Sequence, residues 1–138
     1  MVVEPFTAAD LGAVVEVYRS VGWNTYADAP DVLQAALAGS SRVVTARCAG
    51  TLVGLARVIS DGATICYLQD VLVRPDAQRA GIGRRLVEAA LAPYASVRQK
   101  VLLTDDEPAQ RAFYESLGFS ETGDNSAGTL RAFVRFDA

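Results

Sequence analysis

Residues 67–86 hold the groups best suited to bind a charged ligand. An apolar strand is predicted to end at Val73, Pro75 interrupts the chain, and an amphipathic helix is predicted to open at Gly83. The first N–H groups of a helix have no partner inside it and lie at the positive end of its dipole. This junction therefore predicts an anion-binding site.

Basic side chains gather around the same junction. One acid, Asp76, and four arginines lie between positions 74 and 85, in a chain whose formal net charge is −3. The arginines are Arg74, Arg79, Arg84 and Arg85. A local excess of positive charge in an acidic protein indicates a ligand that carries phosphate.

The spacing of the glycines narrows the choice of ligand. A dinucleotide-binding fingerprint needs a third small residue where this chain has Leu86, and a P-loop needs a Gly-Lys-Ser/Thr tripeptide that the sequence lacks. What remains is the pattern Gln78-x-x-Gly81-x-Gly83. Taken alone, it also fits a tight turn in which the glycines supply only backbone freedom.

Two motifs resemble those of one known family. The pattern from Gln78 to Gly83 resembles the acetyl-CoA signature Gln/Arg-x-x-Gly-x-Gly/Ala of the GCN5-related N-acetyltransferases. The segment Ala112-Phe-Tyr-Glu-Ser-Leu-Gly-Phe119 resembles that family's Phe/Leu-Tyr-x-x-x-Gly-Phe element. Two motifs in the right order, about 30 residues apart, are more specific than one glycine pattern. The resemblance runs from about Arg42 to the C-terminus.

The resemblance implies acetyl-CoA as the cofactor. Backbone N–H groups of the glycine turn would bind its diphosphate, and the edge of the preceding strand would pair with the amides of its pantetheine arm. A backbone N–H near Val71 and Leu72 would polarise the thioester carbonyl. The implied cofactor-binding residues are Val71, Leu72, Val73, Gln78, Arg79, Ala80, Gly81, Ile82, Gly83 and Arg84.

Two side chains are candidate catalytic residues. Tyr114 matches the family's tyrosine that protonates the departing thiolate, and a phenol is protonated at neutral pH; the alternative is a packed aromatic side chain. Relatives often carry Glu or His as the base where this chain has Tyr67 and Gln69. Asp70 is the candidate base here, although strand alternation directs it to the opposite face unless a β-bulge shifts the parity. It could instead be a buried carboxylate paired with Arg57.

The acceptor side is assigned from the family's pattern of elements. The segment between the first two helices covers the acceptor in relatives, which implies Trp23 and Tyr26 as substrate residues together with Gln69; a small core cluster is the alternative for the aromatic pair. Asp105 and Asp106 could attract a cationic amine or be exposed acids at a helix N-terminus. Net acidity favours cationic acceptors such as polyamines, aminoglycosides or lysine side chains, and disfavours nucleic acid.

Length and composition predict one folded domain over residues 1–138. The chain is 51% hydrophobic and 21% charged, as a globular domain is. No apolar run approaches the roughly 18 residues of a membrane span, and the N-terminus lacks signal-peptide features, so we expect a cytoplasmic protein. Cys48 and Cys66 are expected to be buried, reduced thiols. The absence of histidine excludes Ser-His-Asp chemistry and disfavours a zinc site.

The residue patterns, together with the resemblance to that family, predict the elements that must position these residues in the order β-α-α-β-β-β-α-β-α-β-β, which is the order of the N-acetyltransferase fold. The predicted helices are Ala8–Ser20, Pro30–Ala38, one from Gly83 to near Pro93, and Ala109–Leu117. The predicted strands are Val2–Phe6, Arg42–Cys48, Thr51–Ser60, one ending at Val73, Val101–Thr104, Phe119–Thr122 and Thr129–Phe136. The resemblance implies an α/β fold with a mixed central sheet, flanked by helices, that splays between the strands at Val73 and Val101. Acetyl-CoA would lie in that cleft.

These observations predict an N-acetyltransferase that moves an acetyl group from acetyl-CoA to a primary amine of a small molecule or peptide. The amine would attack directly in a ternary complex, with no covalent enzyme intermediate. A catalytically weak CoA-binding sensor or interaction module is the alternative, because Tyr67 and Gln69 are not usual bases. Another donor, such as succinyl-CoA, also fits. We expect no metal and no membrane partner, and a homodimer is common in the family.

Overall fold

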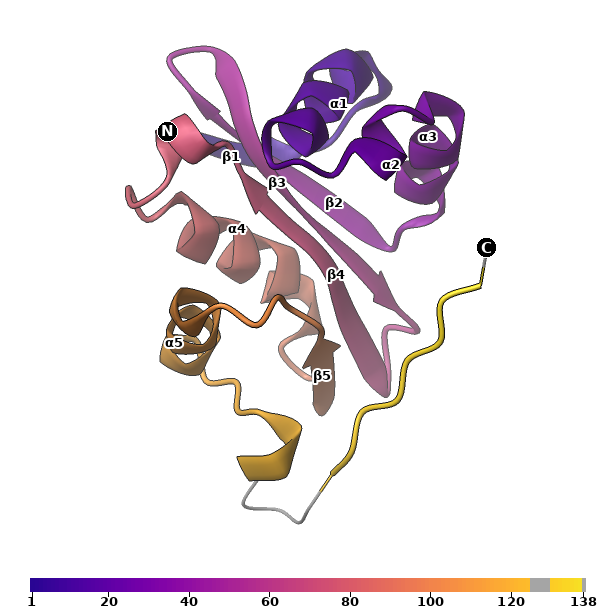
Figure 1. The fold of residues 1–138 in the computed structure, drawn as a ribbon, viewed down its shortest axis with the longest axis vertical. Coiled ribbons are helices and arrows are strands. Elements are labelled where there is room, and N and C mark those ends of the chain that lie inside the picture. Colours follow the sequence, from indigo (N-terminus) through magenta and orange to yellow (C-terminus); the bar gives the residue numbers. More distant parts are fainter. Residues whose placement is uncertain (125–129, 138) are drawn as a thin grey trace. The chain divides into compact units, whose positions relative to one another are not determined.

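Five strands form one mixed sheet in the computed structural model, which describes residues 1–124 and 130–137 (Figure 1). The strands are β1 (Val2–Pro5), β2 (Arg42–Cys48), β3 (Thr51–Ser60), β4 (Ile65–Val73) and β5 (Gln99–Leu102). They follow one another across the sheet in sequence order. Strands β1 to β4 pair antiparallel, whereas β4 and β5 pair parallel.

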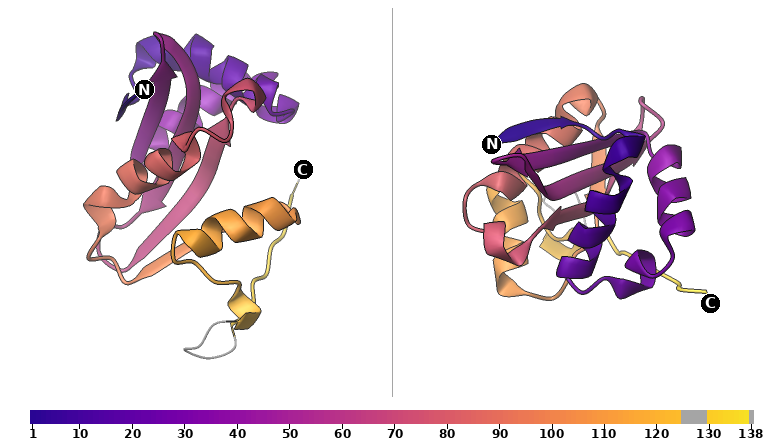
Figure 2. Two further views of the ribbon diagram at one scale, coloured as in Figure 1. Left: turned by 90° about the vertical axis from the view of Figure 1, so that its left-hand side faces the viewer. Right: turned by 90° about the horizontal axis from the view of Figure 1, so that it is seen from above.

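The chain divides into two compact units, Met1–Leu103 and Thr104–Ala138. The helices are α1 (Leu11–Ser20), α2 (Asn24–Ala27), α3 (Pro30–Gly39), α4 (Ile82–Leu91) and α5 (Pro108–Ser116). Within the first unit, α1 to α3 cover one face of the sheet and α4 covers the other (Figure 2). The predicted α/β class, a mixed sheet flanked by helices, is confirmed. The second unit contains α5 and a short 3-10 turn at Thr122–Asp124.

The pairing of β4 with β5 covers only the first part of β4. It runs from Ile65 opposite Gln99 to Leu68 opposite Leu102. The pairing of β4 with β3, by contrast, continues to Val73. Within residues 1–124 and 130–137, no strand pairs with the β5 side of β4 beyond Leu68. The splay predicted between these two strands is therefore confirmed, and it leaves an open strand edge.

Apolar residues at helical spacing explain how α1 and α4 pack on the sheet. In α1, Val14, Val17 and Tyr18 are fully buried, at positions i, i+3 and i+4 of one face. They pack in one cluster with apolar side chains of α3, β3 and β4. The opposite helix, α4, buries Ile82, Leu86, Val87 and Ala90.

Gly54 on β3 lets α4 and β4 approach closely. A Cβ atom added there would lie 2.7 Å from the Leu72 carbonyl oxygen and 3.0 Å from Leu86 Cδ1. Gly54→Ala is therefore expected to lower the free energy of unfolding by about 1–3 kcal/mol through overpacking, as measured by urea denaturation. The matched control is Gly12→Ala in α1, where a Cβ meets nothing within 4 Å. It should raise that free energy by about 0.5 kcal/mol, and equal effects of the two variants would contradict this account.

The prediction of two C-terminal strands is wrong for the described residues. Residues 122–124 form a 3-10 turn, and residues 130–137 have no regular secondary structure; residue 129 lies outside the described part. One backbone hydrogen bond, from Leu130 N to Thr122 O at 3.3 Å, links the two segments. The apolar alternation gives β propensity, but a strand also needs a ladder of hydrogen bonds to a partner.

Other element boundaries also differ from the prediction. The segment between the first two predicted helices contains the one-turn helix α2. The strand predicted to begin at Val101 begins at Gln99. The first helix is preceded by a 3-10 turn at Ala8–Asp10, where the Asp10 carboxylate accepts from Thr7 N at 3.2 Å. That contact is part of a capping box formed by Thr7 and Asp10.

Candidate functional site

The turn between β4 and α4 contains two residues in the left-handed backbone region. Gly81 has φ +78° and Arg79 has φ +68°. Gly81 is the N-cap of α4, and Arg85 N donates to Gly81 O at 3.2 Å. The N–H groups of Ile82 and Gly83 therefore lie in the first turn, where a helix offers them no acceptor. The structure thus places the glycine motif at a helix N-terminus, a geometry that suits an anion.

The glutamine of the motif ties this turn to the end of the strand. Gln78 Nε2 donates to Val73 O at 3.1 Å, and Ala77 N donates to Arg74 O at 2.9 Å. Ala80 follows in the exposed part of the turn. Both hydrogen bonds fix the start of the turn relative to β4, so the helix N-terminus and the strand edge keep a defined spacing.

Two of the four arginines at the turn form ion pairs with nearby acids. Arg74 Nε lies 3.3 Å from Asp76 Oδ1, and Arg84 Nη1 lies 3.5 Å from Glu88 Oε1. Arg79 and Arg85 are exposed. Exposed pairs of this kind contribute little to stability, so the arginines remain able to turn toward an anion.

Val71, Leu72 and Val73 lie on the part of β4 that β5 does not reach. On their other side they face β3, with Val71 opposite Ala56, Leu72 opposite Leu55 and Val73 opposite Gly54. The Leu72 side chain is buried in the core between the sheet and α1. Side chains thus anchor this stretch, while its second backbone edge suits an extended ligand with amides.

Asp70 is buried and held at one of its two carboxylate oxygens. Its Oδ2 accepts from Tyr18 Oη at 2.6 Å and from Arg57 Nε at 2.9 Å. Only 2% of the residue is exposed. Oδ1 is buried and has no hydrogen-bond partner among the described residues. The sequence allowed two roles for Asp70, and one of them, an ion pair with Arg57, is confirmed.

A β-bulge in β4 accounts for the direction of the Asp70 side chain. Asp70 lies opposite Arg57, but the next facing pair is Leu68 with Val58, so Gln69 is an extra residue. The bulge allowed for by the sequence is therefore present. Gln69 and Tyr67 are half-buried, and burial, followed by the charge of Asp70, raises the pKa of Tyr67.

The two aromatic residues predicted on the acceptor side meet at Tyr18. The ring of Tyr18 lies 6.1 Å from that of Trp23 and 6.2 Å from that of Tyr26. These distances are typical of aromatic pairs, so the cluster is a real packing unit. Tyr26 is nevertheless 42% exposed. The structure therefore connects Trp23 and Tyr26 to Asp70 through a single buried side chain.

Tyr18 itself was missed by the sequence reasoning. Its ring lies on the buried face of α1 with Val14 and Val17, and in the sequence this pattern is typical of a residue that only packs in the core. The available signal is its hydroxyl, because a buried tyrosine usually needs a hydrogen-bond partner. An acid on an otherwise apolar strand was the natural candidate for that partner.

Tyr114, Asp105 and Asp106 belong to the second unit. Tyr114 lies on α5 and is half-buried, with ring centroids 4.9 Å from Phe113 and 6.0 Å from Phe119. Burial raises its pKa to about 12. Its hydroxyl is therefore protonated throughout the neutral range and can act as an acid. Asp105 and Asp106 are exposed.

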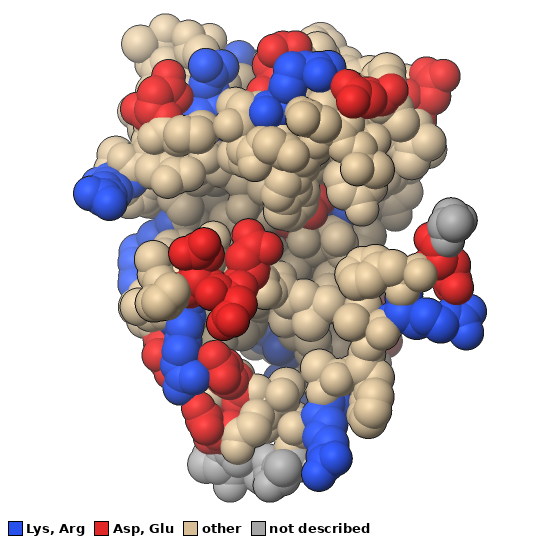
Figure 3. Space-filling model, viewed as in Figure 1, with Lys and Arg blue, Asp and Glu red and all other residues tan. Residues whose placement is uncertain are grey.

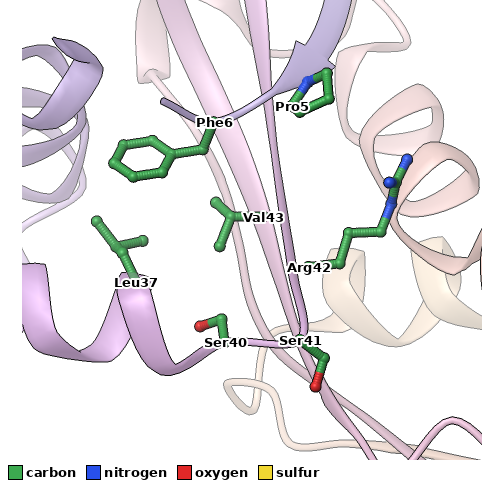
Figure 4. A pocket seen from close by; sticks show the side chains of 7 residues that line it. All are labelled: Pro5, Phe6, Leu37, Ser40, Ser41, Arg42 and Val43. Carbon is green, nitrogen blue, oxygen red and sulfur yellow. The ribbon is translucent and has the colours of Figure 1, made fainter. Parts of the chain in front are cut away.

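A surface pocket of about 280 Å³ lies elsewhere in the first unit (Figure 4). Among its lining residues, Arg42 extends toward α4 and donates from Nε to Ala89 O at 3.0 Å. None of the predicted site residues lines it. The lining residues are Pro5, Phe6, Leu37, Ser40, Ser41, Arg42 and Val43.

The cysteines and surface charges add little chemistry of their own. Both cysteines are free thiols; Cys66 is buried, which raises its pKa, whereas Cys48 is half-exposed rather than buried as predicted. Within the described ranges, no three Cys, Asp or Glu residues group as metal ligands would. Likewise, no helix in that part of the chain has the length and apolarity to cross a membrane. Acidic and basic side chains intermingle on the face shown in Figure 3.

Comparison with known proteins agrees with this geometry. The Acetyltransferase (GNAT) domain family model matches residues 14–135. Serotonin N-acetyltransferase 2, chloroplastic, from Oryza sativa subsp. japonica is 32% identical over 133 residues, which make up 94% of this chain and 64% of that protein. The chain spans 40% to 64% of the length of the curated relatives it matches.

Solved structures share the fold. A GNAT family acetyltransferase from Streptococcus pneumoniae TIGR4 is 28% identical with a TM-score of 0.80, covering 99% of this chain and 98% of that one. An aminoglycoside N-acetyltransferase solved in complex with CoA has a TM-score of 0.74 at 17% identity, covering 99% and 93% of the two chains. The family match extends over both units of the structure, and so the chain belongs to the GNAT acetyltransferase family.

Proposed function

We propose that this chain transfers an acetyl group from acetyl-CoA to a primary amine of a small molecule or peptide. The observation that carries the proposal is the N-terminus of α4, with its left-handed turn, beside the open edge of β4. The N–H groups of Gly81, Ile82 and Gly83 would bind the diphosphate. The edge at Val71 and Val73 would pair with the pantetheine amides. Another protein of this fold was solved with CoA.

The proposed reaction is direct attack within a ternary complex. The neutral amine attacks the thioester carbonyl carbon, a C–N bond forms, and the C–S bond breaks. A backbone N–H near Val71 or Leu72 stabilises the oxyanion. Asp70 takes the proton from the nitrogen, and Tyr114 protonates the thiolate. The products are the N-acetylated amine and CoA, and we propose that residues 1–138 make up a single N-acetyltransferase domain.

The acceptor class is proposed from the aromatic cluster. A half-exposed Tyr26 beside Trp23 and Tyr18 suits an amine that carries an aromatic ring or a positive charge. The rice relative is named for serotonin, which is such an amine. The two free cysteines suit a reducing compartment, and we propose the cytoplasm.

Two measurements test this function. Titration calorimetry with CoA should give a micromolar dissociation constant. Thiol release from acetyl-CoA should accelerate with at least one amine among serotonin, spermidine, an aminoglycoside and a lysine peptide. CoA binding without turnover on any amine would favour a sensor module instead. The absence of both CoA binding and turnover would overturn the proposal. Faster thiol release from succinyl-CoA than from acetyl-CoA would change the proposed donor.

Replacing Arg79 should separate stability from cofactor binding. Arg79→Gly is expected to raise the free energy of unfolding by about 1 kcal/mol, because a left-handed backbone strains any residue with a Cβ. It should also weaken CoA binding about tenfold through the loss of one charge-assisted contact. Urea denaturation and calorimetry measure the two effects.

The matched control is Ala49→Gly. Ala49 is also left-handed, with φ +50°, but it lies in the turn between β2 and β3. The same gain in stability with unchanged CoA affinity is expected for this variant. If Ala49→Gly weakened CoA binding as much as Arg79→Gly does, the role of the turn in binding would be refuted.

A further inference from the structure

The free oxygen of Asp70 is the one buried polar side-chain atom that lacks a partner in the part of the chain described. A buried carboxylate oxygen without a donor costs folding free energy, and such atoms usually have a water or a functional partner. The other oxygen of the same group has two donors. The asymmetry therefore comes from the arrangement of the neighbours.

Tyr18 and Arg57 impose that asymmetry from two different elements. Tyr18 reaches Oδ2 from α1, and Arg57 reaches it from β3. Arg57 is held in turn by its Nη1, which donates to Ser40 Oγ at 3.3 Å at the end of α3. Burial, and next the charge of Asp70, raise the pKa of Tyr18 far above its usual value. Tyr18 therefore remains a donor to Asp70 and does not accept the proton itself.

The location of Asp70 suits a group that acts at the thioester. It lies two residues beyond Leu68, the last residue of β4 that pairs with β5. It directly precedes the open edge at Val71. The aromatic cluster of Trp23 and Tyr26 packs on Tyr18 and so lies on the same face of the sheet.

We propose that Tyr18 and Arg57 are positioning residues, which occupy Oδ2 of Asp70 so that Oδ1 accepts the proton of the attacking amine, directly or through one water. This inference rests on the proposed acetyl transfer. As the C–N bond forms, the nitrogen gives its proton to Oδ1, and the carboxylic acid then returns that proton to solvent. The electron pair of the broken C–S bond leaves with the thiolate.

The first test is Tyr18→Phe, which removes only the hydroxyl. Measured with acetyl-CoA and whichever amine of the panel the wild type accepts, kcat should fall about tenfold. The KM for the amine and the CoA dissociation constant should stay within about twofold, because the variant keeps the ring that packs on Trp23 and Tyr26 and removes only a hydroxyl that is bonded to Asp70. The control is Tyr94→Phe, which removes the hydroxyl of another half-buried tyrosine that has no proposed part in the reaction, and it should keep wild-type kcat.

The second test asks whether Tyr18 acts through Asp70. In an Asp70→Asn background, Tyr18→Phe should lower kcat no further, because there is no longer a base to position. If the loss of kcat persists there, or if Tyr18→Phe alone has wild-type kcat, the inference is wrong. If Tyr18→Phe does not fold, Arg57 carries the test: Arg57→Lys should retain more kcat than Arg57→Gln, and equal losses would overturn the proposal.

These outcomes are distinguishable from failure of the proposed function. A wild-type protein that neither binds CoA nor releases thiol would remove the acetyl transfer itself. A wild-type protein that turns over, with Asp70→Asn equally active, would remove only the role of Asp70 and its two neighbours.

Discussion

Asp70→Asn is expected to lower kcat by about 10²–10⁴-fold, because an amide cannot take the proton of the attacking amine. The fold should survive the change. The amide oxygen of asparagine has the same shape and can still accept from Tyr18 and Arg57, the two donors seen in the structure. CoA binding should be unchanged, because Asp70 takes no part in the diphosphate and pantetheine contacts proposed above. Steady-state kinetics, calorimetry and thermal unfolding measure the three quantities.

The control for this variant is Asp10→Asn. Asp10 is also a partly buried carboxylate paired with an arginine, Arg47, in the same unit, and it has no proposed part in the reaction. It should lower stability and leave kcat unchanged. If both substitutions reduced kcat to the same degree, the loss would reflect a weakened fold and Asp70 would not be the base.

Tyr114→Phe has the second largest expected effect, a fall in kcat of about 10²-fold. The phenol is the proposed proton donor to the thiolate, and its removal makes C–S cleavage harder without altering the ground-state complex. The KM for the amine and the affinity for CoA should therefore change little. The control is Phe119→Leu, which disturbs the aromatic packing around Tyr114 and leaves the hydroxyl in place.

The pH dependence of kcat offers an independent check on Tyr114. Its active form is the protonated phenol, and burial raises its pKa to about 12. The fraction protonated therefore stays near one until the pH approaches that value. We expect no alkaline fall in kcat between about pH 7 and pH 10. A fall centred near the ordinary phenol pKa, absent from Tyr114→Phe, would show that the side chain is more exposed in the working enzyme.

The parts of the site that could be predicted are those governed by local chemistry. A strand, a proline, two glycines and a helix in succession define the turn from Val73 to Gly83, whatever the rest of the chain does. The pairing of Asp70 with Arg57 was open to prediction for a similar reason. A buried acid needs a donor, and the antiparallel neighbour strand carries one.

The parts that could not be predicted depend on distant partners. The contact of Tyr18 with Asp70 joins residues that lie 52 positions apart, and no local pattern encodes it. The C-terminal segment has an alternating pattern, with Leu130, Val134 and Phe136 at even positions, yet no strand forms there. An alternating pattern predicts which face of a strand would be apolar. It does not show that a neighbouring strand is present to pair with it.

The extra residue in β4 has a consequence for the balance between stability and turnover. If Gln69 were deleted, Leu68 could still face Val58 and Asp70 could still face Arg57. The deletion would therefore remove no buried core side chain. The longer strand interrupts the backbone ladder at this point and so gives up some stability. Packing and backbone hydrogen bonding alone would therefore favour the strand without Gln69. We therefore expect a variant that lacks Gln69 to be more stable but slower in turnover than the wild type.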